Sequence, residues 1–346
     1  MTQAISLSQL LRKSGHQVGA VLVGKNPNRQ IPAFFYEKIE APVRTFESPD
    51  FVMDKKNQGI HMLRSILANL RKLKTFSASI RRIDESVKEV EPEVIINFYD
   101  LLTGLYYLRK KPGIPLITIG HQYLLLHPDF IFPKGRWIDK KLLVFNTWFS
   151  GKYAVKQLAI SFSKLPDAEN KKIKVVPPLL RDEVKNMQPQ KRDFLLGYML
   201  NIGYAEEIAA WHAEHREVKL EFFWDNNKAE EITQVNENFH IHRINDRKFL
   251  EYMAGCKAFS STAGFESICE AMYLNKPVMM VPTAGHYEQQ CNALDASRAG
   301  AGIATNQFNL STLLDYIENY KFDHQSYKKW ADSSETIFLE ELTNIM

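Results

Sequence analysis

Residues 255–304 read GCKAFSSTAGFESICEAMYLNKPVMMVPTAGHYEQQCNALDASRAGAGIA, and this stretch decides the fold class. Three short apolar runs, at 257–260, 277–281 and 302–304, have the length and composition of strands buried on both faces of a sheet. Segments with helical spacing lie between them, at 265–274 and 286–299. Strands that alternate with helices predict a parallel sheet with helices on both faces.

The same alternation continues on both sides of this stretch. Further strands are predicted at 18–24, 94–98, 115–119, 193–198, 218–223 and 239–243. Further helices are predicted at 2–14, 101–110, 204–214, 246–255 and 309–319. The chain turns polar at 164–172 and then passes Pro177-Pro178, which places a domain boundary there. We therefore expect an α/β protein with two doubly wound, Rossmann-like domains, residues 1–168 and 169–346, which face each other across a cleft.

The start of the sequence departs from this pattern. A doubly wound domain normally opens with a central strand and a glycine-rich turn, whereas here the helix at 2–14 comes first. Loss of a central strand would leave unpaired backbone on two neighbouring strands of a buried sheet. We expect the first strand of the N-terminal domain to be missing and the natural chain to be longer. The alternative is a fold in which that strand is dispensable or supplied differently.

The composition of the 346 residues is that of a soluble globular protein, with 45% hydrophobic and 24% charged residues. It excludes collagen-like, disordered and small disulfide-rich classes. A formal net charge of +4 is too small to indicate a nucleic-acid partner. Three irregularly spaced cysteines argue against a disulfide framework, and neither a membrane span nor the apolar core of a signal peptide is present. We expect a cytoplasmic protein, at most peripheral on the inner face of the membrane.

Ser261-Thr262-Ala263-Gly264 separates a predicted strand from the helix that begins near Phe265. Small residues at that point let the first backbone amides of the helix approach an anion, and the helix dipole favours negative charge there. A diphosphate would suit such a site. Ser267 and Glu270 are three residues apart and therefore share a face of this helix. A carboxylate at the depth of Glu270 can accept hydrogen bonds from two ribose hydroxyls.

The following strand and helix bring further polar residues to the same edge of the sheet. After the turn at 282–286, the helix begins with Tyr287-Glu288-Gln289-Gln290 and continues to Asn292. Acid and amide side chains at the carboxyl edge of a parallel sheet suit the hydroxyls of a sugar. No P-loop sequence and no cluster with metal-ligand spacing appear, so neither a metal nor a cofactor is expected.

Taken in order, the segments at 261–273, 276–282, 288–293 and 299–302 resemble the donor-binding domain of GT-B glycosyltransferases. The resemblance is strongest to the branch of the peptidoglycan N-acetylglucosaminyltransferase and related uncharacterised bacterial and archaeal glycosyltransferases. It implies an inverting, metal-independent transferase whose co-substrate is a nucleotide diphosphate sugar, UDP-linked, and whose acceptor is unknown. It also implies that the last helix, within 323–346, crosses back to the N-terminal domain.

The resemblance assigns roles to individual residues of the C-terminal half. Gly264 and Phe265 would contact the diphosphate, and Glu270 the nucleotide ribose. The base would lie beside Arg243 and Ile244, and the donor sugar beside Glu288, Gln289 and Gln290. The complete set of expected donor-binding residues is Arg243, Ile244, Thr262, Gly264, Phe265, Ser267, Glu270, His286, Glu288, Gln289 and Gln290.

The general base is expected in the N-terminal half. Asp100 ends one predicted strand, and Gly120-His121-Gln122 follows the next and resembles the acceptor-side loop of the family. His121 has an ordinary pKa near neutrality and Asp100 is ionised without any tuning, so either could remove a proton from an acceptor hydroxyl. Both could also be structural, as a helix cap or a loop hydrogen bond. The glycine-rich loop that the family carries is lacking, so the choice stays open.

Eight basic residues and no acid lie between Asp54 and Asp84. They are Lys55, Lys56, Arg64, Arg71, Lys72, Lys74, Arg81 and Arg82. Apolar residues alternate with them at near-helical spacing, so this stretch could rest on anionic lipid, which would suit a lipid-linked acceptor. The alternative is a solvated face that covers the core. The aromatic residues between Trp137 and Trp148 are expected in the core or at its rim.

Two other functions fit the same pattern. A nucleotide-sugar 2-epimerase of the same fold would act on the donor without an acceptor. A non-catalytic nucleotide-sugar-binding protein would lack the N-terminal glycine-rich loop. Nucleotide sugar is the expected partner in every case, and nucleic acid in none.

Overall fold

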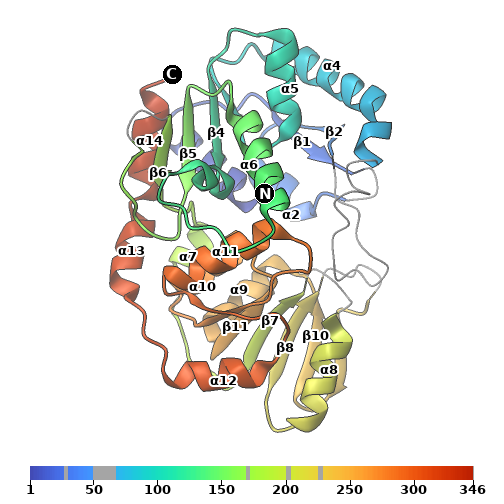
Figure 1. The fold of residues 1–346 in the computed structure, drawn as a ribbon, viewed down its shortest axis with the longest axis vertical. Coiled ribbons are helices and arrows are strands. Elements are labelled where there is room, and N and C mark those ends of the chain that lie inside the picture. Colours follow the sequence, from blue (N-terminus) through green and yellow to red (C-terminus); the bar gives the residue numbers. More distant parts are fainter. Residues whose placement is uncertain (27–29, 50–67, 169–171, 200–203, 225–228, 346) are drawn as a thin grey trace.

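A computed structural model describes residues 1–346 except 27–29, 50–67, 169–171, 200–203, 225–228 and 346. The chain forms two α/β domains, one above the other in Figure 1. Lys55, Lys56 and Arg64 of the predicted basic stretch lie outside the described residues.

The described residues of the N-terminal domain form six strands in two parallel sheets. β1 (Val21–Lys25) pairs with β2 (Val43–Glu47), and a four-stranded sheet has the order β3 (Ile95–Asn97), β4 (Leu116–Gly120), β5 (Lys156–Ile160) and β6 (Ile173–Val176). Its helices are α1 (Thr2–Lys13), α2 (Ala33–Ile39), α4 (Leu73–Val90), α5 (Leu101–Lys110), the 3₁₀ helix η1 (His121–Leu126) and α6 (Trp137–Gly151). The described residues of this domain thus form two separate sheets.

The chain leaves the N-terminal sheet later than residue 168, where the sequence placed the boundary. β6 pairs in parallel with β5, with Gln157 opposite Ile173, and so belongs to the N-terminal domain. Leu179 still packs in an N-terminal core cluster. The described polar residues at 164–168 therefore come between β5 and β6, two adjacent strands of one sheet. A polar loop within a domain and a polar linker between domains have the same composition, which is why the sequence did not separate them.

The C-terminal domain is built on a seven-stranded sheet. Its order is β13 (Gly302–Ala304), β12 (Val278–Met280), β11 (Ala258–Ser261), β7 (Leu195–Met199), β8 (Leu220–Trp224), β10 (Phe239–Arg243) and β9 (Ile232–Asn236). Its helices are α7 (Asp182–Lys185), α8 (Ala205–Glu214), α9 (Asp246–Gly255), α10 (Phe265–Tyr273), α11 (Tyr287–Arg298), α12 (Leu310–Glu318) and α13 (His324–Asp332). Only the edge strand β9 pairs antiparallel among the described strands of this sheet. The parallel sheet agrees with the predicted fold class.

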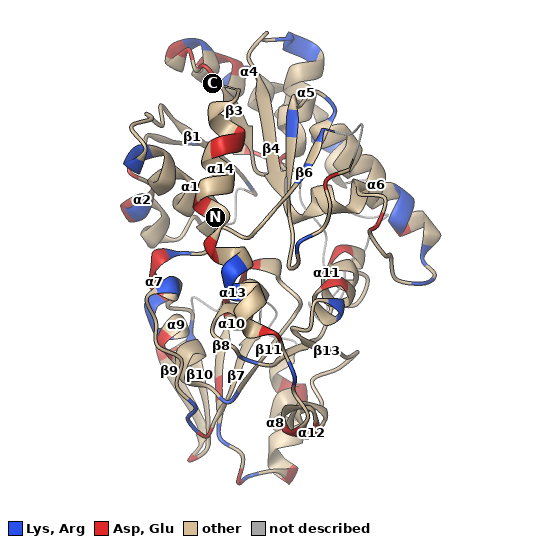
Figure 2. Ribbon diagram, turned by 90° about the vertical axis from the view of Figure 1, so that its left-hand side faces the viewer, with Lys and Arg blue, Asp and Glu red and all other residues tan. Residues whose placement is uncertain are grey.

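The last two helices belong to different domains. α13 packs on α10, and the Tyr327 hydroxyl donates to the Cys269 carbonyl at 3.1 Å. α14 (Ser334–Thr343) instead packs on β6, and its Phe338 and Leu342 are buried in the same N-terminal cluster as Leu7. The chain therefore crosses between the domains a second time, next to Ser333 (Figures 1 and 2).

The aromatic residues of α6 are not buried. Trp137, Phe145 and Trp148 have exposed fractions of 64%, 61% and 45%. The expectation that this segment belongs to the core or its rim is therefore wrong for these side chains. α6 turns its small residues inward instead, with Thr147, Ser150 and Gly151 buried. Among the described residues, no helix combines the length and apolarity needed to cross a membrane.

Candidate active site between the domains

A cleft of about 1850 Å³ lies between the two domains. From the N-terminal domain it is lined by the end of β4 and the start of η1, including Gly120 and His121. From the C-terminal domain it is lined by the start of α10, the loop after β10 and the start of α11. The carboxyl ends of parallel strands from both sheets thus face one space, which is where open α/β sheets bind ligands.

The amino end of α10 is open to this cleft. The preceding Ala263 has φ of 59°, a left-handed conformation that is uncommon for a residue with a side chain. The Asn292 side-chain amide donates to the Ala263 carbonyl at 3.2 Å, so α11 holds the turn in place. A Cβ added at Gly264 would meet only the Ser267 hydroxyl, at 3.7 Å. The space in front of the first helical amides is therefore free for an anion.

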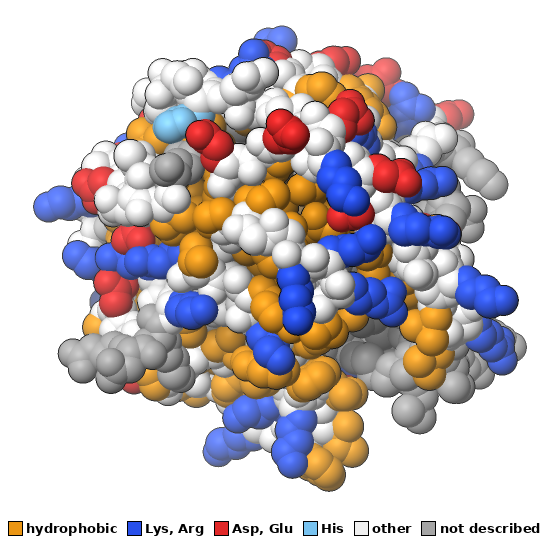
Figure 3. Space-filling model, turned by 90° about the horizontal axis from the view of Figure 1, so that it is seen from above, with side chains coloured by type: hydrophobic (Ala, Val, Ile, Leu, Met, Phe, Trp, Pro, Cys, Tyr) orange, Lys and Arg blue, Asp and Glu red, His pale blue; other side chains and the backbone are white. Residues whose placement is uncertain are grey.

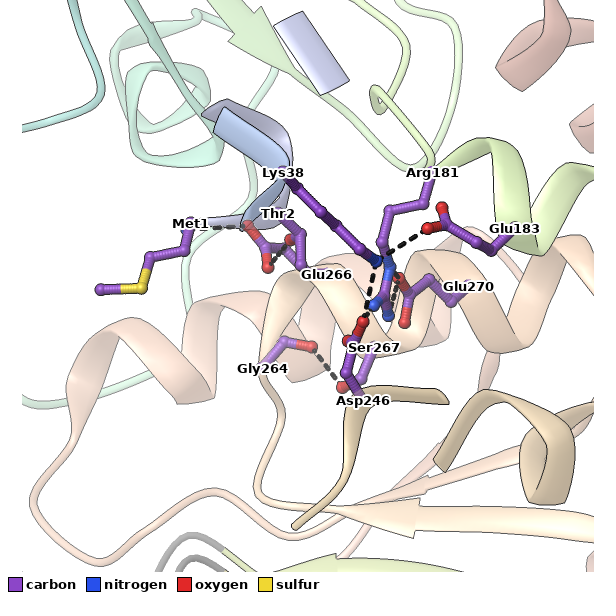
Figure 4. A network of polar contacts seen from close by, with 10 residues as sticks. All are labelled: Met1, Thr2, Lys38, Arg181, Glu183, Asp246, Gly264, Glu266, Ser267 and Glu270. Atoms are coloured by element: carbon purple, nitrogen blue, oxygen red, sulfur yellow. Dashed lines mark hydrogen bonds and ion pairs between the residues drawn. The ribbon is translucent and has the colours of Figure 1, made fainter. Parts of the chain in front are cut away.

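Glu270 lies one turn further along α10 and is held by Arg181, as Figure 4 shows. Its Oε1 accepts from Arg181 Nε at 2.7 Å and from Nη2 at 2.6 Å. The two side chains have exposed fractions of only 5% and 7%. Burial raises the pKa of Glu270 to about 7, more than the neighbouring guanidinium lowers it. The carboxyl thus lines the cleft as a group that titrates near neutrality.

Arg181 also connects the start of α9 to the N-terminal domain. Its Nη1 binds Asp246, which in turn pairs with Lys38 of α2 at 3.2 Å. Lys38 also binds Glu183 of α7 at 2.7 Å. One arginine and one lysine thus form ion pairs with three carboxylates, those of Glu270, Asp246 and Glu183, at the domain boundary (Figure 4). On the same side of the cleft, Thr2 donates its hydroxyl hydrogen to Glu266 in the first turn of α10.

His121 sits directly on the C-terminal domain. Its ring stacks on that of Phe265, the first residue of α10, with centroids 4.2 Å apart. Nδ1 lies 2.8 Å from the Ile160 carbonyl, and because a carbonyl can only accept, this nitrogen carries the hydrogen. Nε2 is left as the basic nitrogen, 3.8 Å from Asp295 Oδ2, and neither atom has a hydrogen-bond partner. Burial lowers the pKa of His121 to about 4 and raises that of Asp295 to about 6.

Asp100 caps a helix. Its Oδ1 accepts from the backbone amides of Leu102 and Thr103, the first turn of α5, at 2.8 and 3.4 Å. Its Oδ2 accepts from the Ser48 hydroxyl at 2.9 Å. Burial raises the pKa of Asp100 despite these bonds. The side chain does not line the cleft.

The start of α11 forms the other wall of the donor side. Glu288 accepts from the Gln122 side-chain amide at 2.9 Å, a contact that joins the two domains across the cleft. The side-chain oxygen of Gln289, Oε1, accepts from the Thr283 backbone amide at 2.7 Å. The backbone amide of Gln289 donates to His286 Nδ1 at 3.4 Å. Burial lowers the pKa of His286, so this ring is neutral at pH 7. These bonds fix the turn between β12 and α11 beside the open end of α10.

The sequence matches the family described as glycosyl transferase family 1 over residues 7–320. The chain belongs to this family. Its chemistry is therefore the transfer of a sugar, and the resemblance seen in the sequence is confirmed.

Solved structures of glycosyltransferases share the fold over almost the whole chain. The glycotransferase of kitacinnamycin has a TM-score of 0.66 and 14% identity, covering 99% of this chain and 95% of that chain. Phytolacca americana UGT2, complexed with UDP-2fluoro-glucose and pterostilbene, has a TM-score of 0.65 and 12% identity, covering 99% and 95%. Acinetobacter baumannii MurG has a TM-score of 0.56 and 14% identity, again covering 99% and 95%. None of the curated proteins matches the sequence.

Most of the expected donor-binding residues of this glycosyltransferase line the one cleft. They are Ile244, Gly264, Phe265, Ser267, Glu270, His286, Glu288 and Gln289, and His121 lines it from the opposite domain. Four expected residues do not: Asp100, which is half-buried at the start of α5, Thr262, which is buried, Arg243, which is exposed, and Gln290, which is half-buried on α11. Thr262 has an exposed fraction of 1%, so it supports the turn from behind.

The structure adds residues that the sequence did not indicate. Arg181, Lys38 and Asp246 form the charge network around Glu270, and Asp295 faces His121. Arg181 lies 89 residues before Glu270 in the chain, and Lys38 lies 208 residues before Asp246. Pairs so far apart carry no spacing signal. The one indication was Glu270 itself, because a carboxylate in an apolar helix face needs a buried cation from somewhere.

Proposed function

We propose that this glycosyltransferase moves a sugar from a UDP-linked donor to the hydroxyl of a lipid-linked acceptor, with inversion and without a metal ion. The observation that carries the proposal is the open amino end of α10, with the buried carboxyl of Glu270 one turn away in the same cleft. An anion site next to a hydroxyl-accepting carboxylate matches a diphosphate joined to a ribose. LpCGTa in complex with UDP and Arabidopsis thaliana UGT89C1 with UDP-L-rhamnose share the fold.

The reaction follows from these positions. The acceptor oxygen attacks the anomeric carbon, the bond from that carbon to the diphosphate oxygen breaks, and the nucleotide leaves with the bonding electron pair. The amides at the start of α10 stabilise the charge that develops on the diphosphate, the part that a metal ion plays in other enzymes. The proton of the acceptor hydroxyl passes to a base of the N-terminal domain.

His121 is the base that we favour over Asp100. It lines the cleft, whereas Asp100 accepts three hydrogen bonds away from it. The Nδ1–H of His121 is held by Ile160, which leaves Nε2 unprotonated and without a hydrogen bond. A bound acceptor has to displace the Phe265 ring or Asp295 to reach this nitrogen. Replacing His121 by Gln should lower kcat by about 100-fold or more, whereas Asp100→Asn should act on stability.

We further propose that the protein works in the cytoplasm, peripheral on the inner face of the membrane. Arg71, Lys74, Arg81 and Arg82 are exposed, whereas the apolar residues Phe76 and Ile80 of α4 are buried in the core. Leu73 at the start of α4 is exposed as well, so this helix offers mainly charge and little apolar surface to a bilayer. Attraction between basic residues and anionic lipid supports an acceptor that is embedded in the membrane.

Calorimetric titration of the full chain with UDP and UDP-sugars tests the donor site. Glu270→Gln should weaken UDP binding by about 10- to 100-fold, because a neutral amide accepts ribose hydrogen bonds less strongly than a carboxylate. Glu221→Gln is the matched control, since Glu221 pairs with His242 outside the cleft. Equal UDP affinity in both variants would refute the ribose assignment. Sugar isomerisation without an acceptor would instead indicate an epimerase.

A further inference from the structure

α6 presents a continuous apolar face to solvent. Besides Trp137, Phe145 and Trp148, Ile138 and Leu142 have exposed fractions of 55% and 38%. At 3.6 residues per turn these five residues fall within an arc of about 140° on the helix. Figure 3 shows hydrophobic side chains together with Lys and Arg side chains at the lower edge of the molecule.

Lysines accompany this face, and acids do not. Lys141 and Lys152 are exposed on the same stripe and lie over the rings of Trp137 and Trp148, with Nζ 4.9 and 5.0 Å from the ring centroids. Lys134 is exposed just before the helix. Asp139 is the one acid within α6; it lies off the stripe and pairs with Arg136 at 3.0 Å. The face is thus apolar and carries positive charge within it.

α6 is fixed to the wall of the cleft. Arg136, at its start, donates to the Gly285 carbonyl at 3.1 Å, and the Tyr287 hydroxyl donates to the Pro133 carbonyl at 3.4 Å. Gly285 and Tyr287 flank His286, which lines the cleft. The exposed face therefore lies next to the donor side of the cleft.

We propose that this α6 face docks on an anionic lipid bilayer, with its aromatic rings in the headgroup region and its lysines on lipid phosphates. Trp and Phe beside Lys are the side chains that suit the boundary between headgroups and acyl chains. The positive charge on this face, without acids, favours anionic lipid over a second copy of the chain, because two such faces would repel each other. The proposal that α6 docks on lipid is independent of the proposed function. The further statement that docking presents the cleft to a membrane-embedded acceptor rests on the proposed function.

Co-sedimentation of the full chain with vesicles tests this proposal. The parent should bind vesicles of an equimolar mixture of phosphatidylcholine and phosphatidylglycerol more tightly than vesicles of phosphatidylcholine alone. The triple variant Trp137→Ser, Phe145→Ser, Trp148→Ser should lose about tenfold or more in affinity for the anionic vesicles. The matched control is Ile232→Ser with Val235→Ser on β9, two side chains that are each 45% exposed far from α6.

Each result decides the matter. Unchanged vesicle binding by the triple variant, or no binding by the parent, would overturn the proposal. A parent that forms dimers in the absence of vesicles, which the triple substitution dissociates, would assign the face to a second copy instead. UDP titration of the same samples shows whether the donor site is intact, because the triple variant should bind UDP with the affinity of the parent. A parent that does not bind UDP would refute the proposed function without affecting the proposal that α6 docks on vesicles.

Discussion

Replacement of Arg181 by Met tests the charge network at the centre of the cleft. Arg181 forms ion pairs with Glu270 and Asp246. When the guanidinium is removed, Asp246 still has the ion pair with Lys38, at 3.2 Å. Among the described residues Glu270 has no other ion-pair partner. The variant therefore buries one carboxylate without compensation, and we expect a loss of about 3–5 kcal/mol in the free energy of unfolding at pH 8.

The size of the loss should depend on pH. The pKa of Glu270 is about 7 in the folded parent and rises further without the arginine, against an ordinary value of 4.5. A group whose pKa is raised on folding gives its stability below the unfolded pKa and loses it as pH rises through the folded pKa. Most of the deficit of the variant should therefore disappear by pH 5, where Glu270 is protonated in the folded state.

Urea unfolding of the full chain at pH 8 and pH 5 measures both quantities. Arg192→Met is the matched control, because Arg192 is exposed and, among the described residues, its side chain donates hydrogen bonds only to Gln190. The double variant Arg181→Met, Glu270→Met should recover most of the loss, since a buried ion pair is often replaced by apolar residues at little cost. A loss below about 1 kcal/mol at pH 8, or an equal loss at both pH values, would refute the reasoning.

Two further predictions concern the domain contact and the sheet edge. In the folded chain the pKa of Asp295 is raised and that of His121 is lowered, and between pH 4 and 6 these two shifts act oppositely on stability. Folded Asp295 holds a proton that the unfolded chain has lost, whereas folded His121 lacks a proton that the unfolded chain holds. Asp295→Asn should therefore lose up to about 3 kcal/mol more than the parent on acidification from pH 6.5 to 4, and parallel unfolding profiles would contradict this. Gly302→Ala would place a Cβ 1.8 Å from the Val278 carbonyl and should cost about 3 kcal/mol in urea unfolding, whereas Gly264→Ala, which faces open space, should cost less than about 1 kcal/mol.

The sequence predicted the C-terminal sheet closely, because its boundaries are written in local chemistry. β10 and α9 begin and end at the predicted residues, and Asn245 between them caps α9 by accepting from the Lys248 amide. β9 was not predicted. Its residues, Ile232–Asn236, form a largely exposed edge strand, and neither a buried run nor a sharp turn signal marks it.

The candidate site was predicted only where one short segment contains it. The turn before α10 and the position of Glu270 follow from consecutive residues of one strand and helix. The partners Arg181 and Lys38 depend on how distant elements pack, which local spacing does not encode. The same limit applies to α6, because helical periodicity identifies an apolar face without saying whether protein or solvent covers it.

The double crossing of the chain between the domains has a mechanical consequence. Both crossings, one after β6 and the other at Ser333 between α13 and α14, lie on the left-hand side of the molecule in Figure 1. Because two covalent connections join the domains, rotation about the line through these two connections is the relative motion of the domains that stretches the chain least. Arg181 follows directly after the first crossing and therefore moves least. Rotation about this line would widen the cleft on the side away from the two crossings.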